Sequence, residues 1–545
     1  MIIGGAGSGK TWNLIDKVVL ETRKGVPISR IAFVTFSKAA AEEARERLMR
    51  RFNCTREDIP LCGTIHSICY KRYCADKKVI KEKHKVQFFK RFNIDYEICR
   101  SDDELISNER IMNVTGNMML NFYDKLRMGL CIDIDDISSN EELRKAFMKM
   151  NIQNLDFEDI FAGSFNVFKI LKAYQEFLRL NNLVDFPQML LLAYKDKYIV
   201  DADILICDEQ QDLSPIQHYI YLLWSQNKKE VYIGGDPNQC IYGFNLANAE
   251  YLLNEIRNID LNNGDEKILL PNTYRMAEKI NTYCSDYISN NLRKDKHIHT
   301  SIKPIKMGGE IIEEEIDQDL NKILNYIDPN KSTFILTRTN YYKQCIIENL
   351  LIPNGIPYSE IKGKSIWSIK YINLFNAIIK LIDKVPLTSE EAGMIFESIP
   401  FKFGLMKRGS KVNFKKSNKK DSYTVTDLLQ AGFHMSIFDY LNYERIFDIL
   451  DVPDIVITAF KATKRAPIQM PINLKISTCH GAKGKEADNV IVVKDVSKRI
   501  SNEISKSIEA FESEIRVFYV GQSRAKEKLV LLRGVFERAD KYIIP

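Results

Sequence analysis

The first eleven residues contain the feature that most restricts how the chain can fold. An apolar start runs into a glycine-rich segment, residues 4–9, followed by Lys10, Thr11 and a helical pattern. Glycines let the backbone wrap a phosphate, the loop amides donate hydrogen bonds, and the N-terminus of the next helix adds a positive dipole. This order predicts an α/β domain that binds phosphate. The residues expected to contact the phosphates are Gly4, Gly5, Ala6, Gly7, Ser8, Gly9, Lys10 and Thr11.

Two residues of this loop and two carboxylates further along the chain carry the expected chemistry. Lys10 would neutralise the β- and γ-phosphates, and the hydroxyl of Thr11 would hold Mg²⁺. A second apolar run, residues 203–207, ends in Asp208 and Glu209. We expect Asp208 to bind Mg²⁺ through water, and Glu209 to act as the base or to orient the attacking water. Alone, such a pair is more often a cap or a surface charge, but the phosphate loop favours the catalytic interpretation.

Short apolar runs bounded by Gly, Asp or Pro alternate with long helical stretches. Continuous apolar runs are typical of parallel strands covered on both faces, and their alternation with helices predicts doubly wound α/β sheets. The runs are residues 31–36, 203–207, 230–234, 333–336, 489–493 and 529–532. Residues 72–165 and 384–470 break this rhythm, so we expect them to be mainly helical insertions.

The second insertion carries a basic run. Such a run either grips duplex nucleic acid, with an affinity that falls steeply with salt, or forms a solvated flexible loop. The sequence leaves both interpretations open. The members of the run are Lys407, Arg408, Lys411, Lys415, Lys416, Lys419 and Lys420.

Composition is that of an ordinary soluble protein. A chain of 545 residues is expected to form several domains, and its net charge of +6 permits a polyanionic partner without requiring one. Eleven cysteines, an odd number, are typical of reduced intracellular thiols. The cluster Cys54, Cys62, Cys69 and Cys74 lacks the close pairs of zinc sites, which favours buried free thiols. No apolar run approaches the roughly 18 residues of a membrane span. We therefore expect an intracellular protein, cytoplasmic or nucleoid-associated, that is not secreted and has no membrane partner.

Further segments follow the phosphate loop in a recognisable order. They are residues 35–41, 64–67, 208–212, 234–244, 270–275, 337–340, 478–486 and 516–525. With the loop as motif I, they resemble motifs Ia, Ib, II, III, IV, the segment after IV, V and VI of the superfamily 1A helicases, the UvrD/Rep/PcrA family. The resemblance runs from residue 1 to about residue 532. It implies two tandem RecA-like domains with parallel sheets, each with a mainly helical insertion, and no nuclease domain.

The resemblance assigns further nucleotide-binding residues. Gln239 matches the motif III residue that links the γ-phosphate to the DNA contacts. Arg275 and Arg524 match the two arginines that reach the γ-phosphate from across the cleft, which makes hydrolysis depend on closure. Glu486 matches a motif V residue near the sugar and phosphates, and Tyr274 matches a residue beside the base.

A second set would contact single-stranded nucleic acid, which is bound by polar groups along the backbone and by stacking aromatics. The candidates are Thr35, Phe36, Thr64, His66, Tyr242, Phe244, Thr478 and His480. Tyr242 and Phe244 are the candidate stackers, although Tyr242 is equally expected in the core. His480 is expected to support the motif V loop more than to touch the strand.

The sequence and the resemblance together predict an ATP-dependent 3′ to 5′ translocase and helicase that uses Mg²⁺. Its expected partners are single-stranded DNA, junctions of single and double strands, and replication or repair proteins. The alternative is an ATP-gated remodeller or clamp that binds single-stranded DNA without separating strands. The expected division is motor domain 1A (1–71 and 166–275), insertion 1B (72–165), motor domain 2A (276–383 and 471–545) and insertion 2B (384–470).

Overall fold

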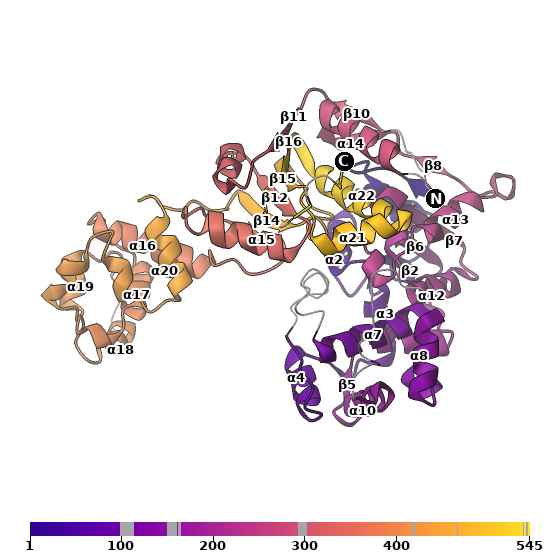
Figure 1. The fold of residues 1–545 in the computed structure, drawn as a ribbon, viewed down its shortest axis with the longest axis horizontal. Coiled ribbons are helices and arrows are strands. Elements are labelled where there is room, and N and C mark those ends of the chain that lie inside the picture. The colour runs from indigo at the N-terminus through magenta and orange to yellow at the C-terminus, as the bar shows by residue number, and fades with distance from the viewer. Residues whose placement is uncertain are drawn as a thin grey trace.

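The computed structural model describes residues 1–98, 114–149, 161, 165–292, 302–416, 420–465, 467–537, 539–540 and 543–545. Two six-stranded sheets form its centre, and every strand pair in them is parallel. A helical lobe extends from each sheet, as Figure 1 shows. The predicted α/β class with parallel sheets and helical insertions is confirmed.

The first sheet has the strand order β3-β2-β6-β7-β1-β8. Its strands are β1 (Ile2–Ile3), β2 (Ile31–Thr35), β3 (Cys62–Thr64), β6 (Ile204–Asp208), β7 (Glu230–Gly235) and β8 (Ile268–Leu269). In β2, Ile31 and Phe33 join the core on one face, whereas Ala32 and Val34 join the core on the other. Burial on both faces explains why this strand is a continuous apolar run.

Helices cover both faces of the first sheet. They are α1 (Lys10–Arg23), α2 (Lys38–Phe52), α3 (Ile65–Tyr73), α11 (Phe186–Lys195), α12 (Pro215–Ser225) and α13 (Glu250–Arg257). Leu14 of α1 and Leu48 of α2 pack on one face, and Ile68 of α3 and Ile216 of α12 pack on the other. Since all strands are parallel, the carboxyl ends of β2, β3 and β6 meet at one edge, where Thr35 is the register partner of both Thr64 and Asp208.

The second sheet has the order β11-β16-β15-β12-β14-β13. Its strands are β11 (Glu310–Glu315), β12 (Thr333–Thr337), β13 (Ser359–Glu360), β14 (Leu474–Thr478), β15 (Ala487–Val493) and β16 (Ala525–Arg533). Its helices are α14 (Glu278–Asn291), α15 (Asn340–Ile346) with the π-helical turn Ile347–Leu351, α21 (Lys498–Lys506) and α22 (Ile508–Gln522). The parallel pair β9 (Asn272–Ala277) and β10 (Lys303–Lys306) lies between the two sheets in the chain.

The first insertion is a helical lobe with its own core. It contains β4 (Lys78–Val79), α4 (Glu82–Lys90), α7 (Thr115–Leu130), α8 (Asn140–Lys149), α10 (Val167–Leu180) and β5 (Leu183–Val184). The lobe runs past residue 165, because Ile170, Leu171 and Tyr174 of α10 are buried in the same cluster as Phe122 and Leu126 of α7. We therefore extend insertion 1B to β5, which pairs with β4. These two short strands were not expected from the sequence.

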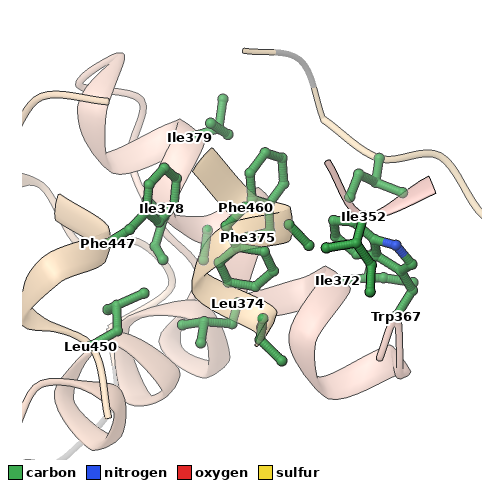
Figure 2. Close-up of a cluster of buried hydrophobic side chains, with 14 of the residues drawn as sticks. Ile352, Trp367, Ile372, Leu374, Phe375, Ile378, Ile379, Phe447, Leu450 and Phe460 are labelled. Carbon is green, nitrogen blue, oxygen red and sulfur yellow. The ribbon is translucent and has the colours of Figure 1, made fainter. Parts of the chain in front are cut away.

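The second insertion forms the lobe at the left of Figure 1. Its helices are α16 (Ile369–Ile382), α17 (Ser389–Ser398), α18 (Ser410–Lys416), α19 (Val425–Gln430) and α20 (Asp454–Ala462). Figure 2 shows Phe375 of α16 beside Phe447 and Phe460, with ring centroids 6.1 and 5.1 Å away. Burying each such ring stabilises the lobe by about 1.5–3 kcal/mol. Because α16 packs into this lobe, we place the start of insertion 2B at Ile369, upstream of the expected residue 384.

The basic run lies on and beyond α18, and Lys419 falls outside the described residues. Lys415 forms an ion pair with Glu397, and Lys420 forms one with Asp427. Lys411 donates a hydrogen bond to the carbonyl of Glu397.

Among the helices that the structure describes, none combines the length and the apolar character needed to span a membrane.

Candidate nucleotide and nucleic-acid site

The phosphate loop joins β1 to α1 and depends on two glycines. Gly7 and Gly9 have φ angles of +74° and +84°, in the left-handed region that other residues rarely adopt. A Cβ on Gly7 would lie 2.5 Å from the Cβ of Arg275, so a larger residue does not fit there. The ammonium of Lys10 donates to the carbonyls of Gly4 and Gly5 at 2.8 and 3.2 Å, and therefore points into the loop.

The two expected magnesium ligands lie together. The hydroxyl of Thr11, in the first turn of α1, donates to Oδ2 of Asp208 at the end of β6, at 2.6 Å. Burial raises the pKa of Asp208 above its usual range, and the neighbouring charge of Glu209 adds to this effect. A hydroxyl and a carboxylate are oxygen ligands of the kind that Mg²⁺ prefers. The residues present therefore fit a magnesium ion at this point.

Glu209 is held in an unusual backbone conformation, with a φ of +58°. Its carboxylate accepts a hydrogen bond from the side chain of Gln211, whose own oxygen accepts from the amide of Asp236. Burial alone would raise the pKa of Glu209, but the charges of Lys483 and Lys10 outweigh it and lower the pKa. Glu209 is therefore ionised at neutral pH, as a base that accepts a proton must be.

Arg524 approaches the same place from the second sheet. Its side chain is 1 % exposed, and one NH₂ group donates to Oε1 of Gln239 at 3.3 Å and to Oγ of Ser523 at 2.9 Å. Gln239 in turn donates to Asp236 at 2.6 Å. Burial and the nearby charge of Arg275 lower the pKa of Arg524 to about 9, so the guanidinium still carries its charge at neutral pH.

Arg275 and Glu486 form the outer part of this arrangement. Nε of Arg275, on β9, donates to the carboxylate of Glu486 at 2.8 Å, and NH1 donates to the carbonyl of Ser523 at 3.2 Å. Lys526 forms an ion pair with the same Glu486 at 2.9 Å. Burial raises the pKa of Glu486, but hydrogen bonds from Lys526 and Arg275 outweigh it and lower the pKa to about 2. The residues predicted around the γ-phosphate thus come together from both sheets.

Two aromatic side chains stand exposed beside the loop. The amide of Tyr274 donates to the carbonyl of Gly7 at 3.0 Å, while its side chain is 60 % exposed. Trp12, directly after Thr11 in α1, is 57 % exposed. The sequence pattern pointed to Tyr274 and not to Trp12, whose place beside the loop appears only in the structure.

Lys483, in motif V, is the main site residue that sequence reasoning missed. Its ammonium lies 2.5 Å from Oδ2 of Asp212 and 3.6 Å from Oε2 of Glu209, and it donates to the carbonyl of Gln239 at 2.6 Å. Burial alone would lower the pKa of Lys483, but Asp212 and Glu209 outweigh it and raise the pKa, so the charge is kept. Burial raises the pKa of Asp212 to about 7 despite this partner. A lysine of the second sheet is thus bonded to motifs II and III of the first.

The candidate nucleic-acid residues divide into two groups. Phe36 and Tyr242 stack with centroids 4.8 Å apart, and Phe244 lies edge-on to Tyr242 at 5.8 Å and to His480 at 5.4 Å. The Nζ of Lys483 lies 5.2 Å above the Tyr242 ring. Tyr242 is buried, whereas Phe244 remains partly exposed and is the more accessible stacker. Motifs Ia, III and V therefore meet in one aromatic cluster.

The remaining candidates make local contacts. The hydroxyl of Thr35 donates to the carbonyl of Ser37, that of Thr64 caps α3, and that of Thr478 accepts from the amide of Gly481. Burial lowers the pKa of His480 well below its usual value, so the ring is neutral.

His66 lies apart from the aromatic cluster. Its ring is 6.0 Å from that of the exposed Phe186, and burial lowers its pKa to about 4.

A phosphate loop on the first of two parallel α/β sheets, contacted by side chains from the second, defines a P-loop protein with two α/β domains in tandem. The chain matches the UvrD/REP helicase N-terminal domain over residues 1–260 and the UvrD-like helicase C-terminal domain over residues 368–533. The chain therefore belongs to the UvrD/Rep/PcrA family, and the predicted resemblance is confirmed.

Relatives in bacteria carry helicase names. A probable DNA helicase II homolog of Mycoplasma capricolum is 27% identical over 406 residues, which are 70% of this chain and 52% of that protein. The ATP-dependent DNA helicase Rep of Buchnera aphidicola is 24% identical over 408 residues, or 70% and 56%. The ATP-dependent DNA helicase PcrA of Leuconostoc citreum is 27% identical over 406 residues, or 70% and 50%. The chain spans about half the length of these relatives.

Proposed function

We propose that the chain is an ATP-driven motor that moves 3′ to 5′ along single-stranded DNA and unwinds duplexes. The observation that carries this proposal is the contact between Arg524 of the second sheet and Gln239 of the first, beside the ionised Glu209. Phosphoryl transfer is catalysed mainly by charge placed around the transferring group. Because residues of two domains complete the site, the rate of hydrolysis depends on the relative position of those domains.

The chain's own residues account for binding and hydrolysis of ATP. Loop amides and Lys10 bind the phosphates, Arg524 and Arg275 stabilise charge on the γ-phosphate, and Glu209 orients water and accepts its proton. Thr11 and Asp208 would hold Mg²⁺, which supplies positive charge to the phosphate oxygens when bound.

The rim of the site suits a nucleoside. Tyr274 and Trp12 offer exposed rings beside the loop, and aromatic faces stack on bases. Glu486, held by Arg275 and Lys526, would lie toward the sugar. We assign the base to the space near these two rings.

Coupling to the strand would run through motif III. Gln239 bonds Arg524, and its carbonyl accepts from Lys483, which also lies over the Tyr242 ring. A change in the contact between the two domains at Gln239 would therefore shift Lys483 and, with it, the position of the aromatic cluster. Alternating closure and opening of the two domains would then give alternating grip on the strand.

Strand separation on duplexes with a 3′ or a 5′ single-stranded tail tests the proposal. We expect ATP-dependent unwinding from the 3′ tail, and none with Lys10→Ala. ATP hydrolysis stimulated by DNA without unwinding on either duplex would instead support an ATP-gated remodeller or clamp. A protein that hydrolyses ATP at the same rate with and without DNA would contradict both.

The cellular setting follows from the proposed substrate. A motor on DNA works inside the cell, at junctions of single and double strands, where replication and repair proteins are its candidate partners. We propose that setting for this chain.

A further inference from the structure

One lysine of the helical insertion reaches into the motor. Lys125 belongs to α7 of insertion 1B, and its ammonium donates a hydrogen bond to the backbone carbonyl of Phe244 in motif III. The side chain of Lys125 is only 6% exposed. Lys125 and Phe244 are 119 positions apart in the sequence, so the bond joins two distant segments of the chain. Hydrogen bonds from a charged donor contribute about 1.5–3 kcal/mol, roughly twice a neutral one. This bond is therefore a strong tie between the lobe and the motif III loop.

The helix that carries Lys125 is itself fixed to the first motor domain. Two residues further on, the fully buried guanidinium of Arg127 donates to both carboxylate oxygens of Asp185, at 2.9 and 2.7 Å. Asp185 caps α11, accepting from the amide of Gln188 at 3.1 Å. The ring of Tyr123 lies 3.8 Å from the same guanidinium. The turn of α7 around Lys125 is thus held on two sides, so the lysine presents its ammonium from a fixed position.

The carbonyl that Lys125 holds belongs to the residue that projects the accessible ring. Phe244 lies in the 3-10 turn Gly243–Asn245, and its ring is partly exposed and edge-on to His480 at 5.4 Å. A short 3-10 turn has weak internal hydrogen bonds, so an outside donor has a large effect on its geometry. Fixing the backbone of Phe244 fixes where its ring meets a base.

We infer that Lys125 is a positioning residue: through it, insertion 1B sets the place of the Phe244 ring and thereby the affinity of the motor for single-stranded DNA. The inference rests on the proposed function, because it assigns the grip on the strand to a residue outside every motif. Lys125 acts through the backbone of Phe244. Replacing Lys125 therefore changes the affinity for single-stranded DNA. The hydrolysis rate at saturating DNA stays the same, because it is set by the residues of the nucleotide site.

The test is ATP turnover measured against the concentration of oligo(dT) for Lys125→Met, Lys125→Arg and a control, Lys145→Met. Lys145 lies in the same lobe, with its side chain 71% exposed in an ion pair with Glu141. Stacking on one base is worth about 1–3 kcal/mol, so losing the ring's position raises the half-saturating DNA concentration of Lys125→Met about tenfold. Turnover without DNA and turnover at saturating DNA stay within about twofold of the wild type. Lys125→Arg, which keeps a charged donor, restores half-saturation to within about threefold, and Lys145→Met behaves as the wild type.

Three results would overturn the inference. One is a half-saturating concentration for Lys125→Met that equals that of the wild type. Another is a loss of saturated turnover that accompanies a lower thermal midpoint, which would make the lysine merely structural. The third is a Lys125→Arg variant as impaired as Lys125→Met. Failure of the proposed function is distinct from all three, since the wild type itself would then show no stimulation by oligo(dT).

Discussion

Removing the ammonium of Lys483 would loosen a buried part of the contact between the two motor domains. The side chains of Lys483 and Asp212 are 8 and 2% exposed, so solvent screens their interaction little. Breaking a buried ion pair by removing one partner costs about 3–5 kcal/mol. Burial already raises the pKa of Asp212 to about 7. The Asp212 carboxyl that has lost its lysine partner can therefore take up a proton at neutral pH. We therefore expect Lys483→Met to cost less than that range, about 2–3 kcal/mol.

Hydrogen exchange of backbone amides measures this cost locally, without assuming that a multidomain protein unfolds in one step. A loss of about 2–3 kcal/mol accelerates exchange roughly 30- to 150-fold. The acceleration should appear in the motif V loop around Lys483 and in the turn Pro237–Gln239, because Lys483 holds the carbonyl of Gln239. In an Asp212→Asn background, the same substitution should cost less, about 1 kcal/mol, because only the bond to the carbonyl of Gln239 and the longer contact with Glu209 remain to be lost.

Lys485→Met is the matched control, because Lys485 lies two residues further along the chain and is exposed. Its exchange should equal that of the wild type. Equal acceleration by Lys483→Met in the wild-type and Asp212→Asn backgrounds would mean that the ion pair contributes nothing. Unchanged exchange in Lys483→Met would mean that Lys483 does not stabilise the contact between the domains.

Three further predictions concern other parts of the chain. Gly7→Ala should lower the thermal midpoint of the nucleotide-free protein more than Gly9→Ala does: both glycines have positive φ, but only a Cβ at Gly7 meets Arg275. Lys494, which follows β15, has its pKa lowered to about 7 by burial and by Arg533. Above pH 7 the unfolded chain then binds more protons than the folded chain. The stability of the wild type should therefore rise relative to that of Lys494→Met between pH 7 and 9, by at most about 1.4 kcal/mol per pH unit. Thermal midpoints measured across this pH range follow the difference. Replacing four exposed basic residues of 2B by glutamine should flatten the salt dependence of duplex binding by about 0.9 in log–log slope per lost phosphate contact, as measured by titration at several salt concentrations. Those residues are Lys407, Arg408, Lys415 and Lys416.

Each of these predictions has a clear opposite. Equal midpoints for the two glycine variants would mean that the loop yields without displacing Arg275. A constant difference between wild type and Lys494→Met across that pH range would mean that Lys494 keeps its ordinary pKa. An unchanged salt slope would assign the basic run to a solvated loop.

The central strands were predictable because burial on both faces leaves a continuous apolar run. The runs at residues 203–207 and 333–336 correspond to β6 (Ile204–Asp208) and β12 (Thr333–Thr337). Strands of two residues, such as β8 and β13, were not predicted, since two residues show no periodicity. An apolar helix has the same pattern whether it covers a sheet or packs in a helical lobe, so the sequence of α16 does not show to which of the two it belongs.

The site was predictable wherever chemistry and local order coincide. A glycine loop followed by Lys10 and Thr11 indicates phosphate binding from consecutive residues alone. A strand that ends in Asp208 likewise indicates a metal ligand from consecutive residues. Lys483 and Lys125 could not be found in this way. Each is one lysine among many, and its role arises from the packing of segments more than one hundred residues apart.

We propose that residues of both sheets complete one ATP site that responds to single-stranded DNA. The measurement that tests this joint site is the ATP turnover of the wild type and of Arg524→Ala, with and without oligo(dT). Arg524 lies in the second sheet's part of the site and bonds Gln239 of the first. We predict that DNA accelerates the wild type and that Arg524→Ala loses at least about a hundredfold of the stimulated turnover with its fold intact. Stimulated turnover of Arg524→Ala at the wild-type rate would mean that Arg524 of the second domain does not contribute to the ATP site.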